Sequence, residues 1–389
     1  MNHTAQPRSI RLGGTYDGAL MAAVQLEEEA MSDIYQKLRE RLDMFPQGFP
    51  KTESGVEMEI LRDLFAEEEA EIMLHLRPSP EAVSDVAERM GRDEKELGER
   101  LYDMSKRGLI LRFRASQEQA LYFLAPWVVG IWEFQVKNLT SENIQLYEKY
   151  HNEAIVPEMR RSKTAGFRVI PVEEEVQANP EIETSEKVSE IIESSTRFAV
   201  SDCICRKEAE MFGHACDRLM EACMMFDMAA DYYIENELGR EITKEEARGI
   251  LEKAEEDGLV HHSSNHQGKK IFICNCCGCC CKALGNITKH GNPDAIARSN
   301  YYAVIDRDEC NGCEICADRC QVDAIRMEDD VAAENREACI GCGLCVSTCP
   351  TECISLIRKT AAEASPIFAD DAELLRTLAR DKNKEYPFQ

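Results

Sequence analysis

The sequence predicts an α+β fold built from several domains. Three observations lead to this prediction. A cysteine run near the C-terminus is duplicated, and short strand-like segments flank each copy. The middle of the chain alternates helix-type and hairpin-type segments around a second group of cysteines. The first 155 residues contain no cysteine and consist mostly of amphipathic helical patterns.

Length and composition limit the kinds of protein that the chain can be. Its 389 residues correspond to two or three domains, and a hydrophobic content of 44% excludes a wholly disordered chain. The chain has 46 basic and 72 acidic side chains, a formal net charge of −26. Such a charge disfavours nucleic acid and anionic membrane surfaces as partners, and it favours docking to a partner protein with a basic face.

The N-terminal domain is expected over residues 1–155. Helices are predicted at 19–44, 57–76, 79–90 and 93–107, with the third starting at Ser79–Pro80, and strands at 109–113 and 120–124. This order resembles the winged-helix family, in which the last helix often reads DNA. Here that helix, Asp93–Arg107, carries five acidic and four basic residues. Because a helix that binds phosphates should be basic, we expect this domain to dock a protein.

The next segment leads into the cysteine-rich part of the chain. Residues 127–139 are expected to form an apolar helix in the core or at a docking face. Residues 156–195 are predicted to be an acidic linker marked by Pro157, Pro171 and Pro180, ending in a short helix at 186–194.

The middle domain is expected over residues 196–298. Apolar spacing predicts a helix at 217–236 that carries Cys223, and Thr243 with Glu246 opens another that Gly258 ends. Residues 259–262 and 269–273 are predicted to form a β-hairpin. This order would deliver the cysteine run that follows the hairpin against the helix that carries Cys223.

The middle domain is also predicted to hold a metal. Six cysteines crowd residues 274–281, and adjacent cysteines point in different directions, so one ion cannot use them all. We expect at least one further centre where the earlier cysteines meet part of this run. The candidate ligands are Cys203, Cys205, Cys216, Cys223, Cys274, Cys276, Cys277, Cys279 and Cys280. Thiolates favour an iron–sulfur centre, with zinc or an unliganded redox-active thiol site as alternatives. The histidines His261, His262 and His266 are expected to be packed or exposed.

The C-terminal cysteines show one spacing, C-x2-C-x2-C-x3-C, written twice. The first copy is Cys310, Cys313, Cys316 and Cys320, and the second is Cys339, Cys342, Cys345 and Cys349. A strand at 301–306 with a return strand at 324–327 is predicted around the first copy, and a pair at 331–334 and 354–358 around the second. Two zinc knuckles are the alternative, disfavoured because zinc sites draw four ligands from one local site.

Residues 301–358 resemble the bacterial 2[4Fe–4S] ferredoxins. The resemblance implies a ferredoxin-like domain over 299–358 and two [4Fe–4S] clusters with crossed ligands. One cluster would be held by Cys310, Cys313, Cys316 and Cys349, and the other by Cys339, Cys342, Cys345 and Cys320. Gln321 stands where the family usually has proline, whereas Pro350 follows the second copy. Cys353 is expected to be a small buried filler.

These features predict an electron carrier or oxidoreductase subunit that relays electrons through the two clusters and the further centre to a redox partner protein. A reductase with its catalytic centre in the middle domain is an alternative, which a substrate-sized pocket beside Cys274–Cys281 would favour. A redox-sensing regulator that uses the winged helix is another. No residue is assigned a catalytic role, and the chain contains no P-loop, G-x-G-x-x-G turn or haem-attachment motif.

The remaining expectations concern the C-terminus and the cellular compartment. Residues 359–389 are expected to contain a helix near 370–380 that packs on the ferredoxin domain or a partner. No secretory leader or membrane insertion is predicted, because the longest apolar stretch, 121–132, is short and interrupted by Pro126. Reduced thiols and cluster ligands predict a cytoplasmic protein of an anaerobe.

Overall fold

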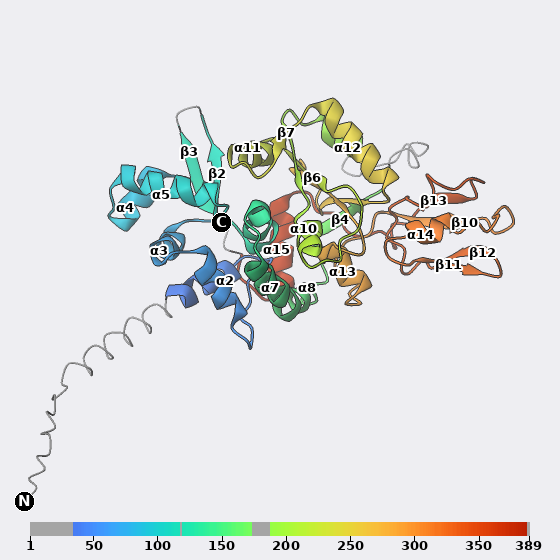
Figure 1. Cartoon of the computed structure of the whole chain (residues 1–389), viewed down its shortest axis with the longest axis horizontal. Helices are drawn as coiled ribbons and strands as arrows, with labels where there is room; N and C mark the ends of the chain where they lie inside the picture. Colours follow the sequence, from blue (N-terminus) through green and yellow to red (C-terminus); the bar gives the residue numbers. More distant parts are fainter. Residues whose placement is uncertain (1–33, 117–118, 173–186, 387–389) are drawn as a thin grey trace, which may run out of the picture.

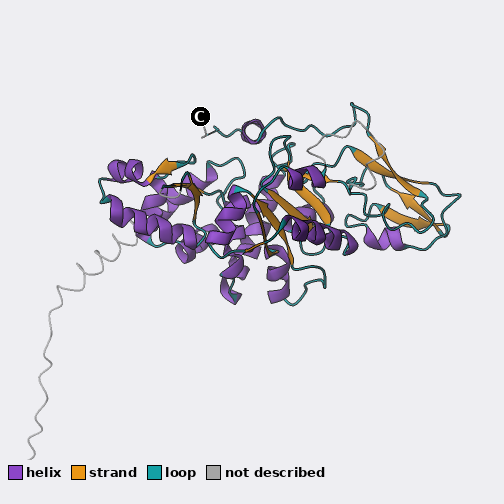
Figure 2. Cartoon of the chain, turned by 90° about the horizontal axis from the view of Figure 1, so that it is seen from above, coloured by secondary structure: helices purple, strands orange, loops and turns teal. Residues whose placement is uncertain are grey.

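The computed structural model describes residues 34–116, 119–172 and 187–386. The molecule is elongated: the N-terminal helices form one end, a central sheet the middle, and the C-terminal cysteine domain the other end (Figure 1). Helices dominate the N-terminal end and strands become prominent toward the opposite end (Figure 2). The predicted mixture of helix and sheet is confirmed. None of the helices in the described ranges is long and apolar enough to cross a membrane.

The N-terminal part combines helices with a small antiparallel sheet of order β1-β3-β2. After a helix at residues 34–43 come α2 (Val56–Leu64), α3 (Glu67–His75), β1 (Glu81–Ala82), α4 (Val83–Met90), α5 (Glu94–Lys106), β2 (Ile110–Arg114) and β3 (Ala120–Leu124). The helix and two strands predicted at 93–124 are confirmed. Of the helix predicted at 19–44, residues 19–33 lie outside the described part of the chain.

Two of the N-terminal predictions are wrong in detail. The single helix predicted at 57–76 is interrupted, because Phe65 and Ala66 are extended and the Glu69 carboxylate accepts from the Ala66 N–H to start α3. The helix predicted from Ser79 starts only at Val83, because Glu81 pairs with Tyr122 of β3. In both places a local contact ends the helical pattern.

A run of short helical segments connects this part to the central sheet. They are η1 (Trp127–Ile131), α6 (Trp132–Phe134), η2 (Gln135–Lys137), α7 (Ser141–Tyr150), η3 (His151–Ile155) and α8 (Val156–Met159). The continuous helix predicted at 127–139 is therefore wrong. Residues 128–130 have non-helical backbone angles, and the Gly130 N–H donates to Glu133 Oε2 at 2.7 Å.

The central sheet has six antiparallel strands in the order β4-β8-β9-β6-β5-β7. The strands are β4 (Phe167–Ile170), β5 (Phe198–Asp202), β6 (Glu221–Phe226), β7 (Arg240–Glu241), β8 (Val260–Ser264) and β9 (Phe272–Cys276). Helices α9 (Val188–Glu193), α10 (Ile204–Met211), α11 (Met228–Glu235), α12 (Lys244–Glu256) and α13 (Lys282–Thr288) surround it. The segment predicted as a linker thus contributes β4 to this sheet. The hairpin prediction is confirmed, as is the cap at Thr243, whose side chain accepts from the Glu246 N–H.

The helix predicted at 217–236 is wrong over its first half. Residues Glu221–Phe226 form β6, which pairs with β5 on one side and β9 on the other, and only α11 is helical. Pairing on both edges satisfies the backbone of β6, and this tertiary context overrides the helical spacing of its apolar residues. Cys223 is therefore carried by a strand.

The C-terminal cysteine domain contains β10 (Tyr301–Ile305), α14 (Ile315–Arg319), β11 (Ile325–Glu328), β12 (Val331–Glu334) and β13 (Ile354–Arg358). The strand positions are confirmed, but the predicted pairing within each cysteine copy is wrong. Strand β10 pairs with β13, and β11 with β12. The turn between β11 and β12 explains this, because Asp329 and Asp330 both have positive φ and form a tight hairpin.

The last helix, α15 (Asp371–Asp381), returns to the middle of the molecule (Figure 1). Lys382 Nζ lies 3.1 Å from Glu158 Oε1 beside α8, and Lys384 Nζ lies 2.8 Å from Asp43 Oδ1. The predicted packing of this helix on the ferredoxin-like domain is therefore wrong, and packing on a partner stays a prediction. Buried lysine–carboxylate pairs attach the C-terminus to the N-terminal half instead.

Candidate metal centres

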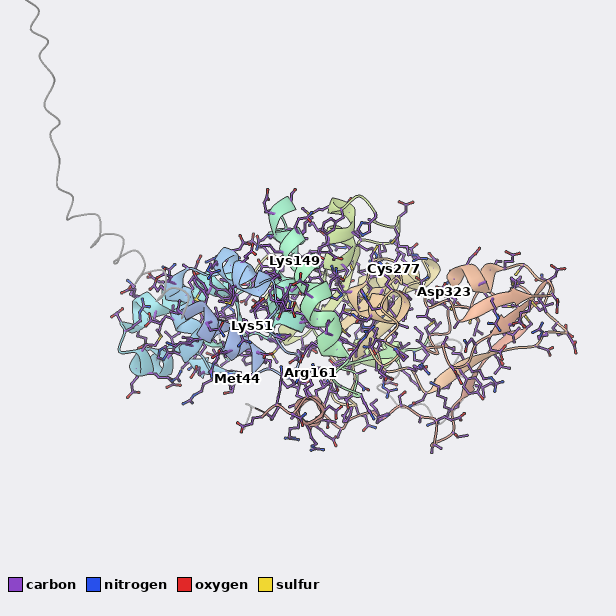
Figure 3. All side chains as sticks on the ribbon, turned by 90° about the horizontal axis from the view of Figure 1, so that it is seen from below. Met44, Lys51, Lys149, Arg161, Cys277 and Asp323 are labelled. Carbon is purple, nitrogen blue, oxygen red and sulfur yellow. The ribbon has the colours of Figure 1, made fainter. Side chains whose placement is uncertain are left out.

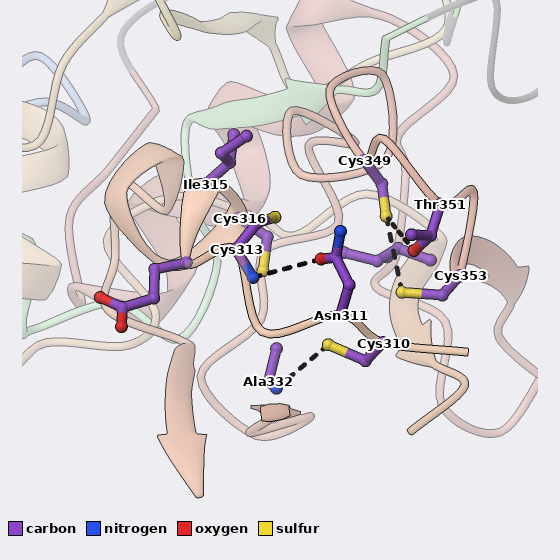
Figure 4. A pocket seen from close by; sticks show the side chains of 11 residues that line it. Cys310, Asn311, Cys313, Ile315, Cys316, Ala332, Cys349, Thr351 and Cys353 are labelled. Atoms are coloured by element: carbon purple, nitrogen blue, oxygen red, sulfur yellow. Dashed lines mark hydrogen bonds between the residues drawn. The ribbon is translucent and has the colours of Figure 1, made fainter. Parts of the chain in front are cut away.

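The first cavity in the C-terminal domain collects cysteines from both copies of the repeated motif. Figure 4 shows these side chains around one space, and the cysteines that line it are Cys310, Cys313, Cys316, Cys349 and Cys353. Gly312 turns the first loop with a φ of 70°, and a Cβ there would lie 2.3 Å from the Asp330 carbonyl oxygen. The fourth cysteine of the second copy thus faces the first loop, as the crossed arrangement requires.

The second cavity collects the complementary quartet, Cys320, Cys339, Cys342 and Cys345. Its other walls are largely apolar, with Val322 and Leu344 among them. Burial raises the pKa of Cys342 to about 12, so an uncompensated thiolate would be costly in this place. Backbone amides already approach the sulfurs, since the Ala324 N–H donates to Cys320 Sγ at 3.1 Å.

Cys353 is buried, and its sulfur lies 3.5 Å from Cys349 Sγ in the first cavity. Figure 4 shows this contact beside Thr351, whose hydroxyl also meets Cys349 Sγ. Its burial confirms the prediction of a small buried residue. Its sulfur is also close enough to Cys349 to replace that thiolate as a ligand.

The comparison with known families bears on this domain. Residues 303–356 match the family of 4Fe-4S dicluster domains. No curated protein matched the chain. The match covers both cysteine quartets, β11 and β12 in full, and β10 and β13 in part. We refer to this part as the dicluster domain.

The middle domain gathers six cysteines into a closed ring of thiol–thiol contacts, which we call the thiol ring. Around the ring the order is Cys203, Cys205, Cys281, Cys276, Cys274 and Cys223, with Cys223 again touching Cys203. The sheet register positions three members of this region side by side, because Cys274 pairs with Cys223 on β6 and with His262 on β8. Cys276 is the last residue of β9, whereas Cys203 and Cys205 lie at the start of α10 and Cys281 at the start of α13.

The surroundings of the thiol ring are suited to negative charge. Helix N-termini stabilise thiolates, and the Leu284 N–H donates to Cys281 Sγ. Hydrogen bonds from neighbouring thiols hold the pKa of Cys203 and of Cys281 well below the ordinary value. The ring nitrogen His262 Nε2 lies 3.0 Å from Cys276 Sγ. Burial acts against its protonation, but its hydrogen bond to Cys281 raises the pKa of His262 overall.

A second, separate group contains Cys216, Cys277, Cys279 and Cys280, and we call it the outer quartet. All four sulfur atoms lie within 4.8 Å of one another. Three of the separations are 3.7 Å for Cys216–Cys277, 3.7 Å for Cys279–Cys280 and 3.8 Å for Cys216–Cys280. Cys279 is exposed, so the outer quartet lies nearer the surface than the ring.

All nine cysteines predicted as further ligands therefore belong to one of two groups. The prediction omitted Cys281 and gave His262 too little weight. The strand alternation of β9 could have indicated that Cys274 and Cys276 share one face, with Asn275 on the other. His261 and His266 are buried elsewhere: His261 Nδ1 lies 2.5 Å from Asn275 Oδ1, and His266 lies beside residue 368.

Gln321 joins the outer quartet to the dicluster domain. Its Oε1 accepts from the Gly278 N–H and from Arg218, both at 2.9 Å. Gly278 lies inside the cysteine run, and Gln321 directly follows Cys320. Cys277 and Asp323 lie close together in Figure 3, where the two domains meet. The residue that departs from the ferredoxin pattern thus makes the interdomain contact.

A polar cavity opens between the two cysteine groups of the middle domain. Cys205 and Cys281 of the thiol ring line it together with Cys279 and Cys280 of the outer quartet. Its volume of about 60 Å³ accommodates a small molecule, since one water needs about 10–15 Å³. The rest of the wall mixes charged residues with Asn152, Ala209, Phe212 and Gly285, and Lys282 Nζ lies 3.1 Å from the buried carboxylate of Glu208.

Proposed function

We propose that this protein transfers electrons between the two clusters of its dicluster domain and a third iron–sulfur centre held by the thiol ring. The dicluster domain and the clustered cysteines indicate an iron–sulfur electron-transfer role. The observation that supports the longer path is packing. One apolar cluster contains Cys276 and Cys281 of the thiol ring together with Val322, and it contacts Cys320 and Cys342 of the second dicluster quartet.

The thiol ring favours a polynuclear centre over a single ion. A tetrahedral ion accepts four ligands, whereas six thiols and His262 converge here. Of these seven groups, only His262, Cys276 and Cys281 lie within 4.8 Å of one another as a set in the described ranges. The remaining sulfurs are spread around a larger space, as expected for several bridged irons.

The partner and the compartment belong to the same proposal. With a net charge of −26, the protein would dock best on a basic face of a redox partner. Nineteen cysteines in a chain whose described residues contain only free thiols fit a reducing cytoplasm, as in an anaerobe.

Iron and sulfide counting on anaerobically purified protein tests the third centre. We expect more than the eight irons that two [4Fe–4S] clusters contain. The double variant Cys223→Ser/Cys274→Ser should lose only the excess iron and its sulfide, and should keep the EPR signals of the dicluster domain. Met211→Ser, which replaces an exposed sulfur-containing side chain outside the quartets and the ring, is the control and should keep all the iron. Eight irons in the unsubstituted protein would refute the third centre.

A reductase is the second candidate function, and the polar cavity favours it. Cys205 and Cys281 of the thiol ring line this cavity together with Lys282, so a small polar molecule in the cavity could approach the ring centre. Cyanide is a suitable small probe. If the cavity gives access to the centre, cyanide should alter the EPR spectrum lost in Cys223→Ser/Cys274→Ser and leave the dicluster signals unchanged. An unaltered spectrum would contradict the reductase and leave the electron carrier.

A further inference from the structure

The spacing of the sulfurs in the outer quartet matches a single tetrahedral ion. With metal–sulfur bonds of about 2.3 Å, the sulfurs at the corners of a tetrahedron are about 3.8 Å apart. The separations of 3.7, 3.7 and 3.8 Å agree with this edge length. The four sulfurs are therefore already spaced as the ligands of one tetrahedral metal ion would be.

The dicluster quartets provide an internal comparison. In a [4Fe–4S] cluster each thiolate binds a different iron at a different corner of the cube, so the four sulfurs must be further apart. In the described part of the chain, neither dicluster quartet brings its four sulfurs within 4.8 Å of one another, whereas the outer quartet does. One chain thus contains two wide quartets and one compact quartet.

The sequence and hydrogen bonds around the outer quartet also resemble a mononuclear site. Cys277 and Cys280 have the C-x2-C spacing common in structural zinc sites. Backbone amides support the sulfurs: the Cys280 N–H donates to Cys277 Sγ and the Arg218 N–H to Cys216 Sγ. The Arg218 guanidinium lies 4.0 Å from Cys279 Sγ, where it would offset the excess negative charge of four thiolates around a divalent ion.

We propose that Cys216, Cys277, Cys279 and Cys280 bind one zinc ion. This inference goes beyond the proposed function, because zinc has no redox chemistry and would lie outside the electron path. Its role would be positional. It would join the loop between α10 and β6 to the run after β9, and so hold the Gly278–Gln321 contact that sets the dicluster domain against the thiol ring.

Zinc X-ray absorption on the full-length protein tests the site without any substitution. We expect about one zinc per chain, surrounded by four sulfurs at about 2.3 Å. Cys216→Ser should lower the zinc content and preserve the iron and sulfide, whereas Met211→Ser, which replaces an exposed sulfur-containing side chain of α10, should change neither. Absence of zinc would overturn the proposal. So would a Cys216→Ser variant that loses iron and sulfide together, because the quartet would then hold an iron–sulfur cluster. The absorption measurement uses the unsubstituted protein, so a variant that fails to fold does not affect it. If the unsubstituted protein contained zinc but only eight irons, the result would refute the proposed function and leave the zinc site.

Discussion

At the scale of single residues, Arg206 is the cation that both cysteine groups of the middle domain share. Its side chain is completely buried and donates to the carbonyl oxygens of Leu219 and Asn275, at 2.6 and 2.7 Å. Burial acts to lower its pKa, but the thiols of Cys203 and Cys277 raise that pKa above the ordinary value. Arg206 is therefore always charged and offsets part of the thiolate charge.

Replacing Arg206 should change the reduction potential of the thiol-ring centre. A nearby positive charge stabilises the more negative, reduced state, so Arg206→Met should lower the potential. The expected shift is on the order of 50–100 mV, since a partly screened charge is worth about 1–2 kcal/mol and about 59 mV corresponds to a tenfold change. Arg206→Lys keeps the charge and serves as the control. EPR-monitored redox titration measures both, and equal shifts in the two variants would mean that packing, not charge, sets the potential.

The crossed ligands of the dicluster domain allow a second test at this scale. Because Cys320 lies in the cavity with Cys339, Cys342 and Cys345, Cys320→Ser should damage the cluster of the second loop and spare the first. Cys349→Ser should affect the first cluster, but only partly, because Cys353 lies 3.5 Å away and can replace the lost thiolate.

The double variant Cys349→Ser/Cys353→Ser should remove that replacement and abolish the first cluster. Site-resolved EPR with iron counting distinguishes the cases. If Cys320→Ser removed the first cluster and left the second, the crossed assignment would be wrong.

At the scale of elements, the segment after β9 connects the thiol ring, the outer quartet and the dicluster domain. Gly278 within this segment lies against the backbone of Gln321, and a Cβ there would be 2.2 Å from the Gln321 carbonyl oxygen. Arg319 adds a second attachment, donating to the carbonyl oxygens of Glu255 and Glu256 at the end of α12. The residues on either side of Cys320, Arg319 and Gln321, thus attach the dicluster domain to the middle domain.

Gly278→Ala should force these elements apart and destabilise the protein by about 1–3 kcal/mol, the usual cost of overpacking. Gly249→Ala is the matched control, because Gly249 lies in α12 with open space around its Cα, and a helix-interior alanine should stabilise by about 1 kcal/mol. Thermal unfolding under anaerobic conditions should show a lower midpoint for Gly278→Ala and an equal or higher one for Gly249→Ala. A midpoint for Gly278→Ala at or above that of the unsubstituted protein would contradict the contact.

At the scale of the whole molecule, the charge distribution bears on what the N-terminal part can bind. Helix α5 is the element expected to read DNA in a winged helix, but two of its cations and Arg107, which follows it, form ion pairs within the protein. Arg100 pairs with Glu68, Arg107 with Glu69, and Lys106 with Glu237. These ion pairs lower the positive charge that α5 could present to phosphates.

The full-length protein should therefore show no salt-dependent retention on duplex DNA, because counterion release requires several phosphate contacts. Glu68→Gln removes a partner of both Arg92 and Arg100, and should increase retention only at low salt. Binding with a sub-micromolar dissociation constant at physiological salt would contradict this expectation and favour the redox-sensing regulator.

The sequence alone determined the features that depend on residues close together in the chain. The repeated cysteine spacing indicated the dicluster domain, because three thiolates two residues apart can wrap one cluster from a single loop. Thr243 with Glu246 indicated where α12 begins, because a helix cap involves residues only three positions apart. The strands flanking the cysteine repeats were likewise predictable from their local pattern.

Only the tertiary structure decided how the upstream cysteines are divided. Cys276 and Cys277 are neighbours in the chain, yet one belongs to the thiol ring and the other to the outer quartet, because β9 ends at Cys276 and Cys277 meets Cys216, which is far away in the sequence. Cys223 joins the ring because β6 pairs between β5 and β9, and this pairing overrides a helical pattern in its sequence. Such contacts join residues far apart in the chain, so their outcome depends on which strands become neighbours.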